Sequence, residues 1–323
     1  MTYKNLGNTG CKVSSLCMGT MTFGRESDKT TSKKLYSMCR DAGINFFDCA
    51  NGYAGGESEK ILGKLAKGHR EEVILASKVY YPTGKGVNER GLSRFHITKA
   101  LDATLKRLGT DYVDVYYLHH FDANTPLVET LATLNDFVRQ GKVLYLGISN
   151  FAAWQVMKAI AICQQNNFAR INCLQPMYNL LKRQCESEIL PMAISENLGV
   201  FPYSPIAGGL LSGKYQHKAP EAGRFNVSQM YQKRYEDERK LETLNAFLDF
   251  AKTNNYHPVS LAIAWVGSHS GVTAPIIGAR NEEQLKPVLA ALDIDMDKQL
   301  YDALAELSIG PAIATDRAEE IKS

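Results

Sequence analysis

The sequence predicts an α/β protein whose eight parallel strands close into a (β/α)8 barrel. Short apolar segments of strand length recur eight times along the chain, and segments with helical apolar spacing lie between them. Strands that alternate with helices form a parallel sheet, and eight is the number that closes a barrel of this class. A doubly wound sheet is the alternative fold, but it requires a Gly-x-Gly-x-x-Gly fingerprint after its first strand, which is missing here.

The expected elements follow one another along the chain. The first is a hairpin over residues 3–13, where Gly7, Asn8 and Gly10 supply turn chemistry. The eight barrel strands are expected at residues 13–18, 44–47, 73–76, 113–118, 143–148, 171–174, 200–202 and 274–277. Helices are expected at residues 96–108 and 127–138, and Gly109 and Gly141 are placed to end them. A length of 323 residues suits one barrel, so we expect residues 1–323 to form a single domain.

The long connection over residues 214–238 shows no apolar period and is rich in polar residues. A connection of this length in a compact domain is often a lid or a binding loop. We expect the charged run over residues 236–240 to be the solvated start of a helix.

Composition and charge exclude several classes of function. The 37 basic and 34 acidic residues leave a net charge of +3, which gives no electrostatic reason to expect a nucleic acid or a membrane surface as partner. No apolar run approaches the length of a membrane span, and the N-terminal residues lack the apolar core of a signal peptide. Seven cysteines occur singly, without a Cys-x-x-Cys pair, which favours reduced thiols and a cytoplasmic location.

Polar or glycine residues follow nearly every expected strand. In chain order these strand-end residues are Gly19 and Thr20, Asp48, Lys78, His119, Ser149 and Asn150, Gln175, Tyr203 and Ser204, and Gly278, Ala279 and Arg280. The carboxyl ends of the strands share one face of a barrel, where active sites form. A polar residue can simply end a strand, but eight such ends with several ionisable types indicate a site.

Three of these side chains, Asp48, Lys78 and His119, fit the reduction of a carbonyl group together with Tyr53, which follows Asp48 in a glycine-rich loop. A hydride that reaches a carbonyl carbon forms an alkoxide, which needs a proton, and a phenol with a pKa of about 10 is a weak donor at neutral pH. A lysine about 4 Å away is worth about 4 kcal/mol at an effective dielectric near 20, so Lys78 is expected to lower the pKa of Tyr53 by about two. Asp48 would neutralise and position Lys78, and His119 would orient the carbonyl oxygen.

Three other chemistries are disfavoured. A metal site at His119 and His120 would need both side chains on one face, but neighbours on a strand point to opposite faces. Residues 208–215 resemble a phosphate-binding loop, but Tyr215 stands where Ser or Thr would hold magnesium, so we exclude an NTPase. The same glycines and Lys214 can still cradle a pyrophosphate. A Schiff-base lyase through Lys78 is disfavoured because Asp48 would keep the amine charged.

The ordered set of motifs resembles the aldo-keto reductases over residues 3–310. The matching stretches are residues 45–48 with Tyr53, Ser77 with Lys78, and residues 114–119, 147–150, 203–209 and 276–280. The resemblance implies a TIM barrel whose base is closed by the N-terminal hairpin. It implies an NADPH-dependent reduction of an aldehyde or ketone, with Tyr53 as general acid, Asp48 and Lys78 tuning it, and His119 orienting the substrate.

The resemblance also implies a set of residues that bind NADPH. It places the nicotinamide against Ser149, Asn150 and Gln175 with Tyr203 stacked on the ring, and adds Gly19, Thr20, Met21 and Asp48 to the cofactor set. It assigns the pyrophosphate to Ser204, Pro205, Ile206, Gly208 and Lys214, with Arg224 closing over it, and the adenosine end to Gly278, Arg280 and Gln284. Arg280 favours NADPH over NADH because a guanidinium binds a 2′-phosphate bidentately. Tyr53, His119 and His120 would line the pocket of a small carbonyl substrate.

Some features depart from the family pattern or point to another branch. Pro287 and Val288 stand where many members carry Glu and Asn against the adenine, and little chain follows Gly310. Residues 88–94 resemble the branch that contains the β-subunits of voltage-gated potassium channels, which bind NADPH as partners of a membrane protein. Those subunits typically lack the catalytic histidine, so His119 favours an enzyme.

Overall fold

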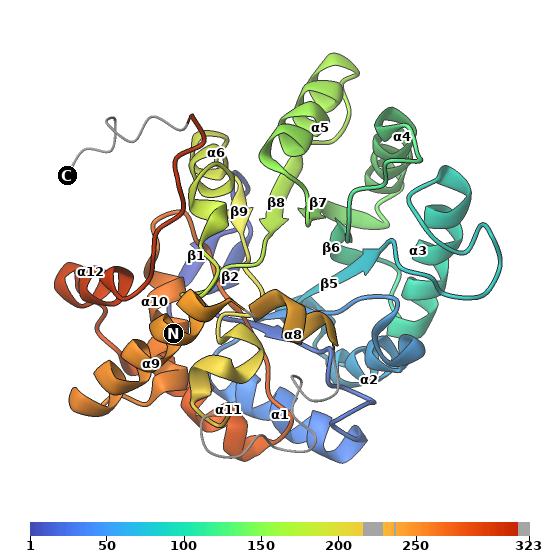
Figure 1. The fold of residues 1–323 in the computed structure, drawn as a ribbon. Coiled ribbons are helices and arrows are strands. Elements are labelled where there is room, and N and C mark those ends of the chain that lie inside the picture. The colour runs from blue at the N-terminus through green and yellow to red at the C-terminus, as the bar shows by residue number, and fades with distance from the viewer. Residues whose placement is uncertain (216–228, 236, 316–323) are drawn as a thin grey trace.

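The eight-stranded barrel is confirmed by the computed structural model, which describes residues 1–215, 229–235 and 237–315. Within these residues, one sheet contains eight parallel strands in the order β10-β3-β4-β5-β6-β7-β8-β9, with the helices around it (Figure 1). The strands are β3 (Cys17–Gly19), β4 (Phe46–Asp48), β5 (Ile74–Val79), β6 (Val113–Leu118), β7 (Val143–Ser149), β8 (Ile171–Gln175), β9 (Gly199–Val200) and β10 (Ile276–Ile277).

Backbone hydrogen bonds connect the two outer strands of this order and close the barrel. Thr273 N donates to Val200 O at 2.9 Å, and Ile276 N donates to Pro202 O at 2.8 Å. The short strands β9 and β10 are therefore continued by less regular chain that still satisfies its backbone groups across the seam.

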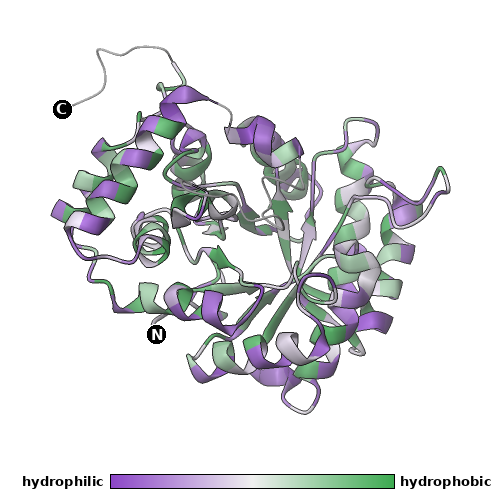
Figure 2. Ribbon diagram, turned by 60° about the horizontal axis from the view of Figure 1, so that its bottom comes forward, coloured by the Kyte–Doolittle hydropathy of each residue, from purple (hydrophilic) through white to green (hydrophobic). Residues whose placement is uncertain are grey.

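The helices lie outside the strands and turn their apolar sides inward. Figure 2 shows apolar residues concentrated on the central strands and polar residues on the outer helix faces. The α-helices are α1 (Lys29–Asp41), α2 (Glu57–Ala66), α3 (Arg94–Leu108), α4 (Leu127–Arg139), α5 (Ala153–Gln165), α6 (Ile189–Ser195), α8 (Gln229–Tyr235), α9 (Glu238–Thr253), α10 (Pro258–Ser268), α11 (Glu282–Leu289) and α12 (Lys298–Glu306). Short 3-10 turns are η1 (Tyr53–Gly56), η2 (Arg70–Glu72), η3 (Gln184–Glu186), η4 (Ala207–Ser212) and η5 (Ala290–Asp293).

Local sequence explains where the expected helices begin and end. Ser93 caps α3 by accepting a hydrogen bond from His96 N, and Gly109 ends the helix in the left-handed conformation at φ 67°. Helix α4 ends at Arg139, and Gly141 follows with φ 72°. None of the helices in the described residues is long and apolar enough to cross a membrane.

The N-terminal hairpin covers the barrel at the amino ends of the strands. Strand β1 (Tyr3–Asn5) pairs antiparallel with β2 (Lys12–Ser14). Leu6 and Val13 are fully buried and join the apolar interior of the barrel, where they contact the same cluster as Phe46 and Phe201. With the base filled by apolar side chains, the carboxyl ends of the strands are the end of the barrel left for a site.

Two sequence expectations are corrected here. The apolar run over residues 13–18 is not one strand: Val13 belongs to the hairpin, and β3 starts at Cys17 because only there does the chain pair with β10 and β4. The connection over residues 214–238 contains the helix α8, whose Tyr231 and Tyr235 are buried. Helix α9 begins at Glu238 with Asp237 as its N-cap, as expected. Residues 216–228 and 236 lie outside the described part of the chain.

Candidate active site

The alternation of side chains along the strands brings the expected site residues to one layer of the barrel. The barrel interior contains Phe46, Ala76, Tyr117, Cys173 and Phe201. Because side chains alternate along a strand, the residue two positions further along each of these strands also faces inward, one layer nearer the carboxyl ends. Those residues are Asp48, Lys78, His119, Gln175 and Tyr203. The sequence expected these five at strand ends, and the register of the parallel sheet gathers them around one axis.

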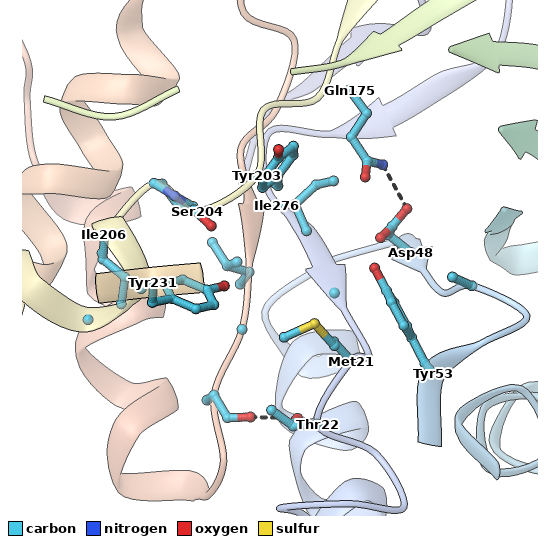
Figure 3. A pocket seen from close by; sticks show the side chains of 18 of the residues that line it. Met21, Thr22, Asp48, Tyr53, Gln175, Tyr203, Ser204, Ile206, Tyr231 and Ile276 are labelled. Carbon is cyan, nitrogen blue, oxygen red and sulfur yellow. Dashed lines mark hydrogen bonds between the residues drawn. The ribbon is translucent and has the colours of Figure 1, made fainter. Parts of the chain in front are cut away.

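A buried ion pair lies at the floor of this layer. The ammonium of Lys78 donates to Asp48 Oδ2 at 2.5 Å and to Cys49 O at 2.6 Å, and Lys78 is fully buried. Gln175 Nε2 donates to the other carboxylate oxygen of Asp48 at 2.9 Å (Figure 3). Burial opposes the charge of Lys78, but Asp48 and Tyr53 raise its pKa above the ordinary 10.5. Lys78 is therefore a fixed, charged ammonium inside the protein.

Tyr53 brings its hydroxyl to this ammonium from a tight turn after β4. Lys78 Nζ donates to Tyr53 Oη at 3.3 Å and lies 4.9 Å from the centre of the ring. The turn η1 holds Ala54 at φ 48°, a left-handed conformation that costs a non-glycine residue about 1–3 kcal/mol. In Figure 3 the Tyr53 hydroxyl points toward Asp48.

The expected lowering of the pKa of Tyr53 is wrong for this structure. Burial raises the pKa of Tyr53 to about 12, although Lys78 acts to lower it. The cation favours the phenolate, but the cost of placing a phenolate away from water is the larger effect here. Tyr53 is therefore a neutral phenol over the physiological pH range, poised to give a proton only to a strong base.

His119 stands beside Tyr53, and its neighbour His120 does not. The rings of His119 and Tyr53 meet edge to face with centres 6.2 Å apart, and Tyr81 packs on His119 at 4.9 Å. Burial, with Lys78 as a second cause, lowers the pKa of His119 well below 6.5, so its imidazole is neutral. His120 is exposed, stacks on Tyr80 at 5.1 Å and is not among the residues that line the cavity, because strand parity turns it outward.

A chain of hydrogen bonds fixes the polar wall beside Gln175. Ser149 Oγ donates to Gln175 O at 2.9 Å, and Asn150 Nδ2 donates to His119 O at 2.9 Å. Tyr203 Oη donates to Asn150 Oδ1 at 2.7 Å. Asn150 holds φ 58°, a left-handed conformation that asparagine tolerates better than most residues.

The loop after Tyr203 is built to expose backbone. Ser204 and Ala207 have φ of 59° and 51°, and Gly208 and Gly209 have φ of 68° and 100°. A Cβ added at Gly208 would lie 2.6 Å from the ring of Tyr231, so only glycine fits there. The two glycines bring backbone without a side chain to the cavity wall, and Ala207 N and Gly209 N donate to Ser204 O and Ile206 O within the loop. Turns of this kind can present their remaining N–H groups to an anion.

One cavity of about 500 Å³ joins these parts. It runs from the strand-end layer past the loop of Ser204 to the segment after β10 (Figure 3). Of the expected cofactor set, the cavity is lined by Gly19, Met21, Asp48, Ser149, Asn150, Gln175, Tyr203, Ser204, Pro205, Ile206, Gly208, Lys214, Gly278, Arg280 and Gln284. Thr20 is buried and donates to Asp48 O at 3.0 Å, and it does not line the cavity. Arg224 lies outside the described residues.

Sequence reasoning missed several residues of the cavity wall. Asn51, Tyr81, Tyr231 and Arg234 line it, and none of them ends a barrel strand. Asn51 is buried, and its Nδ2 has no hydrogen-bond partner among the described residues. Val288, noted from sequence as a departure, also lines the cavity. Asn51 could have been expected in the wall from the sequence, because it lies two residues before Tyr53. Tyr231 and Arg234 could not, because they lie on a helix without a recognisable apolar period.

Comparison with known proteins identifies the class of the barrel. The model of the aldo/keto reductase family matches residues 15–309. The chain belongs to the aldo/keto reductase family. This member is similar to uncharacterized oxidoreductase YrpG of Bacillus subtilis (strain 168), with 40% identity over 98% of this chain and 99% of the relative. It is also similar to proteins called probable voltage-gated potassium channel subunit beta, with 38% identity in Oryza sativa subsp. japonica and 36% in Arabidopsis thaliana, each over 91% of this chain and 92% of the relative.

The cavity of this aldo/keto reductase fits the cofactor of its family. Family members generally bind NAD(P)H, a dinucleotide with an amide at one end and phosphates further along. The wall offers amide and hydroxyl groups beside the ion pair, a loop of bare backbone in the middle, and the cations Lys214 and Arg280 beyond. In the described residues we find no group of His, Cys, Asp or Glu side chains arranged to hold a metal ion.

Proposed function

We propose that this aldo/keto reductase uses NADPH to reduce an aldehyde or ketone to the alcohol, with Tyr53 as the general acid. One observation carries the proposal. The Tyr53 hydroxyl lies 3.3 Å from the Lys78 ammonium, which Asp48 holds in place, and both Tyr53 and Asp48 line the cavity that fits the cofactor. A proton donor, a fixed cation and a dinucleotide-shaped cavity are the parts that carbonyl reduction needs.

Each side chain has one task in the proton transfer. The cofactor supplies a hydride to the carbonyl carbon when it is bound. Tyr53 then donates its proton to the carbonyl oxygen, which accepts it readily even from a phenol whose pKa is about 12, because an alkoxide is a stronger base than a phenolate. Lys78 stabilises the phenolate that remains, and Asp48 keeps Lys78 charged and oriented.

His119 positions the carbonyl oxygen in this proposal. Its pKa is lowered by burial, so the ring is a neutral imidazole with one N–H donor. Its ring packs edge to face against Tyr53 with ring centres 6.2 Å apart, and both residues line the same cavity. A neutral donor polarises the carbonyl without competing with Tyr53 to deliver the proton.

We propose NADPH rather than NADH because of Arg280. This residue lines the far end of the cavity, next to Gln284, whose Oε1 accepts a hydrogen bond from Arg280 N at 3.1 Å. A guanidinium matches the geometry of a 2′-phosphate, which NADH lacks. Lys214 and the loop of Gly208 would meet the pyrophosphate.

A second candidate function is that of a binding subunit. The relatives named probable voltage-gated potassium channel subunit beta match 91% of this chain, and residues 88–94 point to the same branch. Such a subunit would bind NADPH through the same cavity and dock on another protein. His119, which lines the cavity beside Tyr53, supports the enzyme over this alternative.

Turnover of a panel of aldehydes tests the choice. Purified protein is mixed with NADPH and each aldehyde, and loss of reduced nicotinamide absorbance is followed. We expect turnover, and Tyr53→Phe should lower kcat by about 10²–10⁴-fold with an unchanged Kd for NADPH. Tyr80→Phe is the matched control, since Tyr80 does not line the cavity. Tight NADPH binding without turnover of any aldehyde would favour the binding subunit.

We also propose a cytoplasmic location. All seven cysteines are free thiols, and six of them are buried. Free thiols persist in reducing compartments, whereas oxidising ones favour disulfides. Fractionation of cells that express the tagged protein tests this, and recovery outside the cytoplasm would contradict it.

A further inference from the structure

Arg234 is a cation in the cavity wall that the proposed reaction does not use. It lies on α8, is half-buried and lines the same cavity as Tyr53 and His119. Its guanidinium carbon lies 5.1 Å from the centre of the Tyr231 ring. This cation–π contact fixes the side chain on the wall of the cavity instead of leaving it extended into water.

The surroundings of Arg234 place it near the reacting end of the cavity. Burial raises the pKa values of Tyr203 and Tyr81, and the charge of Arg234 acts to lower both. Tyr81 packs on His119 with ring centres 4.9 Å apart, and Tyr203 donates to Asn150 in the strand-end layer. Arg234 therefore acts on side chains that adjoin the histidine and the polar wall, whereas Arg280 follows β10 at the far end.

Among the described residues, the cavity offers Arg234 no free counterion. Among the described residues that line the cavity, Asp48 is the only carboxylate, and its two oxygens are taken by Lys78 and Gln175. Within the described residues no carboxylate forms an ion pair with Arg234. A half-buried guanidinium that adjoins a reaction site is well placed to meet an anionic group on a ligand.

We propose that the substrate of this reductase is a carbonyl compound that carries a carboxylate, which Arg234 binds. This inference rests on the proposed carbonyl reduction and names its substrate class. The aldehyde would enter toward Tyr53 and His119, while its carboxylate pairs with the Arg234 guanidinium on the cavity wall. The ring of Tyr81, which lines the cavity and packs on His119, would contact the hydrocarbon part. A hydride from NADPH and the proton of Tyr53 reduce the carbonyl to the alcohol, NADP⁺ is released, and the carboxylate is unchanged.

Three matched aldehydes test the proposal: para-carboxybenzaldehyde, its methyl ester and para-trimethylammoniobenzaldehyde. We expect kcat/KM to be highest for the carboxylate and lowest for the cation. Arg234→Gln should lower the ratio of kcat/KM for the carboxylate to that for the ester by roughly tenfold, the weight of one charge-assisted hydrogen bond. The loss should appear in KM, because Arg234 binds the substrate away from the reacting carbon. Arg234→Lys should restore part of the ratio.

Lys233→Gln is the matched control, because it removes one positive charge from the adjacent, exposed position of α8 that does not line the cavity. An equal effect of both glutamine variants would overturn the proposal, since it would reflect the overall charge. An Arg234→Gln variant that keeps the wild-type ratio, or that weakens NADPH binding as much as it weakens carboxylate use, would also overturn it. Turnover of the neutral ester with no preference for the carboxylate refutes the substrate class alone. No turnover of any aldehyde refutes the carbonyl reduction as well.

Discussion

Removing the carboxylate of Asp48 should leave a buried, unpaired ammonium. Lys78 is 0% exposed and Asp48 3% exposed, and their charged atoms are 2.5 Å apart, so water does not screen the pair. Loss of one partner of such a pair costs about 3–5 kcal/mol of unfolding free energy. Lys78 could escape by losing its proton, which from its ordinary pKa of 10.5 costs about 5 kcal/mol at pH 7 at about 1.4 kcal/mol per pKa unit. Asp48→Asn should therefore destabilise the protein by about 3–5 kcal/mol.

A double-mutant cycle separates the pair from the two side chains. Urea unfolding is followed by circular dichroism for wild type, Asp48→Asn, Lys78→Met and the double variant, all without cofactor. The double variant has lost both charges of this pair, so we expect it to be more stable than Asp48→Asn alone, with a coupling of at least about 2 kcal/mol. Additive single effects, or a loss below about 1 kcal/mol for Asp48→Asn, would refute the reasoning.

Lys78 and Tyr53 should make the protein less stable at alkaline pH. The pKa of Lys78 is raised above 10.5, so its contribution is full below that pH and is lost as pH rises through the folded pKa. The pKa of Tyr53 is raised to about 12, so the unfolded chain releases this proton above pH 10 while the folded chain holds it. Stability should fall as pH rises above about 10, and Lys78→Met and Tyr53→Phe should each flatten that fall.

Two further predictions concern His119 and Arg280. The pKa of His119 is lowered well below 6.5, so the unfolded chain binds a proton first as pH falls, and the free energy of unfolding should decrease below pH 6.5. His119→Gln should reduce this decrease, measured by urea titrations at a series of pH values below 7. The same dependence of unfolding free energy on pH in the variant would contradict the burial account. Arg280→Ala should shift the ratio of Kd values toward NADH by roughly tenfold or more, measured by nicotinamide fluorescence, and an unchanged ratio would remove Arg280 from the 2′-phosphate.

Much of the site followed from local sequence because the alternation of side chains along a strand is local. Strand β6 has the bounds expected from its apolar run, and His119 continues its inward face one step beyond the strand. The same alternation shows why His120 faces away, although the resemblance to the family had put it in the substrate pocket. The alternation of inward and outward side chains could be read from the sequence, and at His120 it predicted the orientation better than the family resemblance did.

By itself the sequence determined the barrel, its family and the layer of polar strand ends, since each depends on residue types at short, regular spacing. Only the tertiary structure decided the direction of the pKa shift of Tyr53, because burial depends on all the chain packed around it. Only the tertiary structure also brought Arg234 and Tyr231 into the cavity, from a helix more than 170 residues after Tyr53. Contacts and dehydration between distant segments are set by how the whole chain packs, and no local pattern records them.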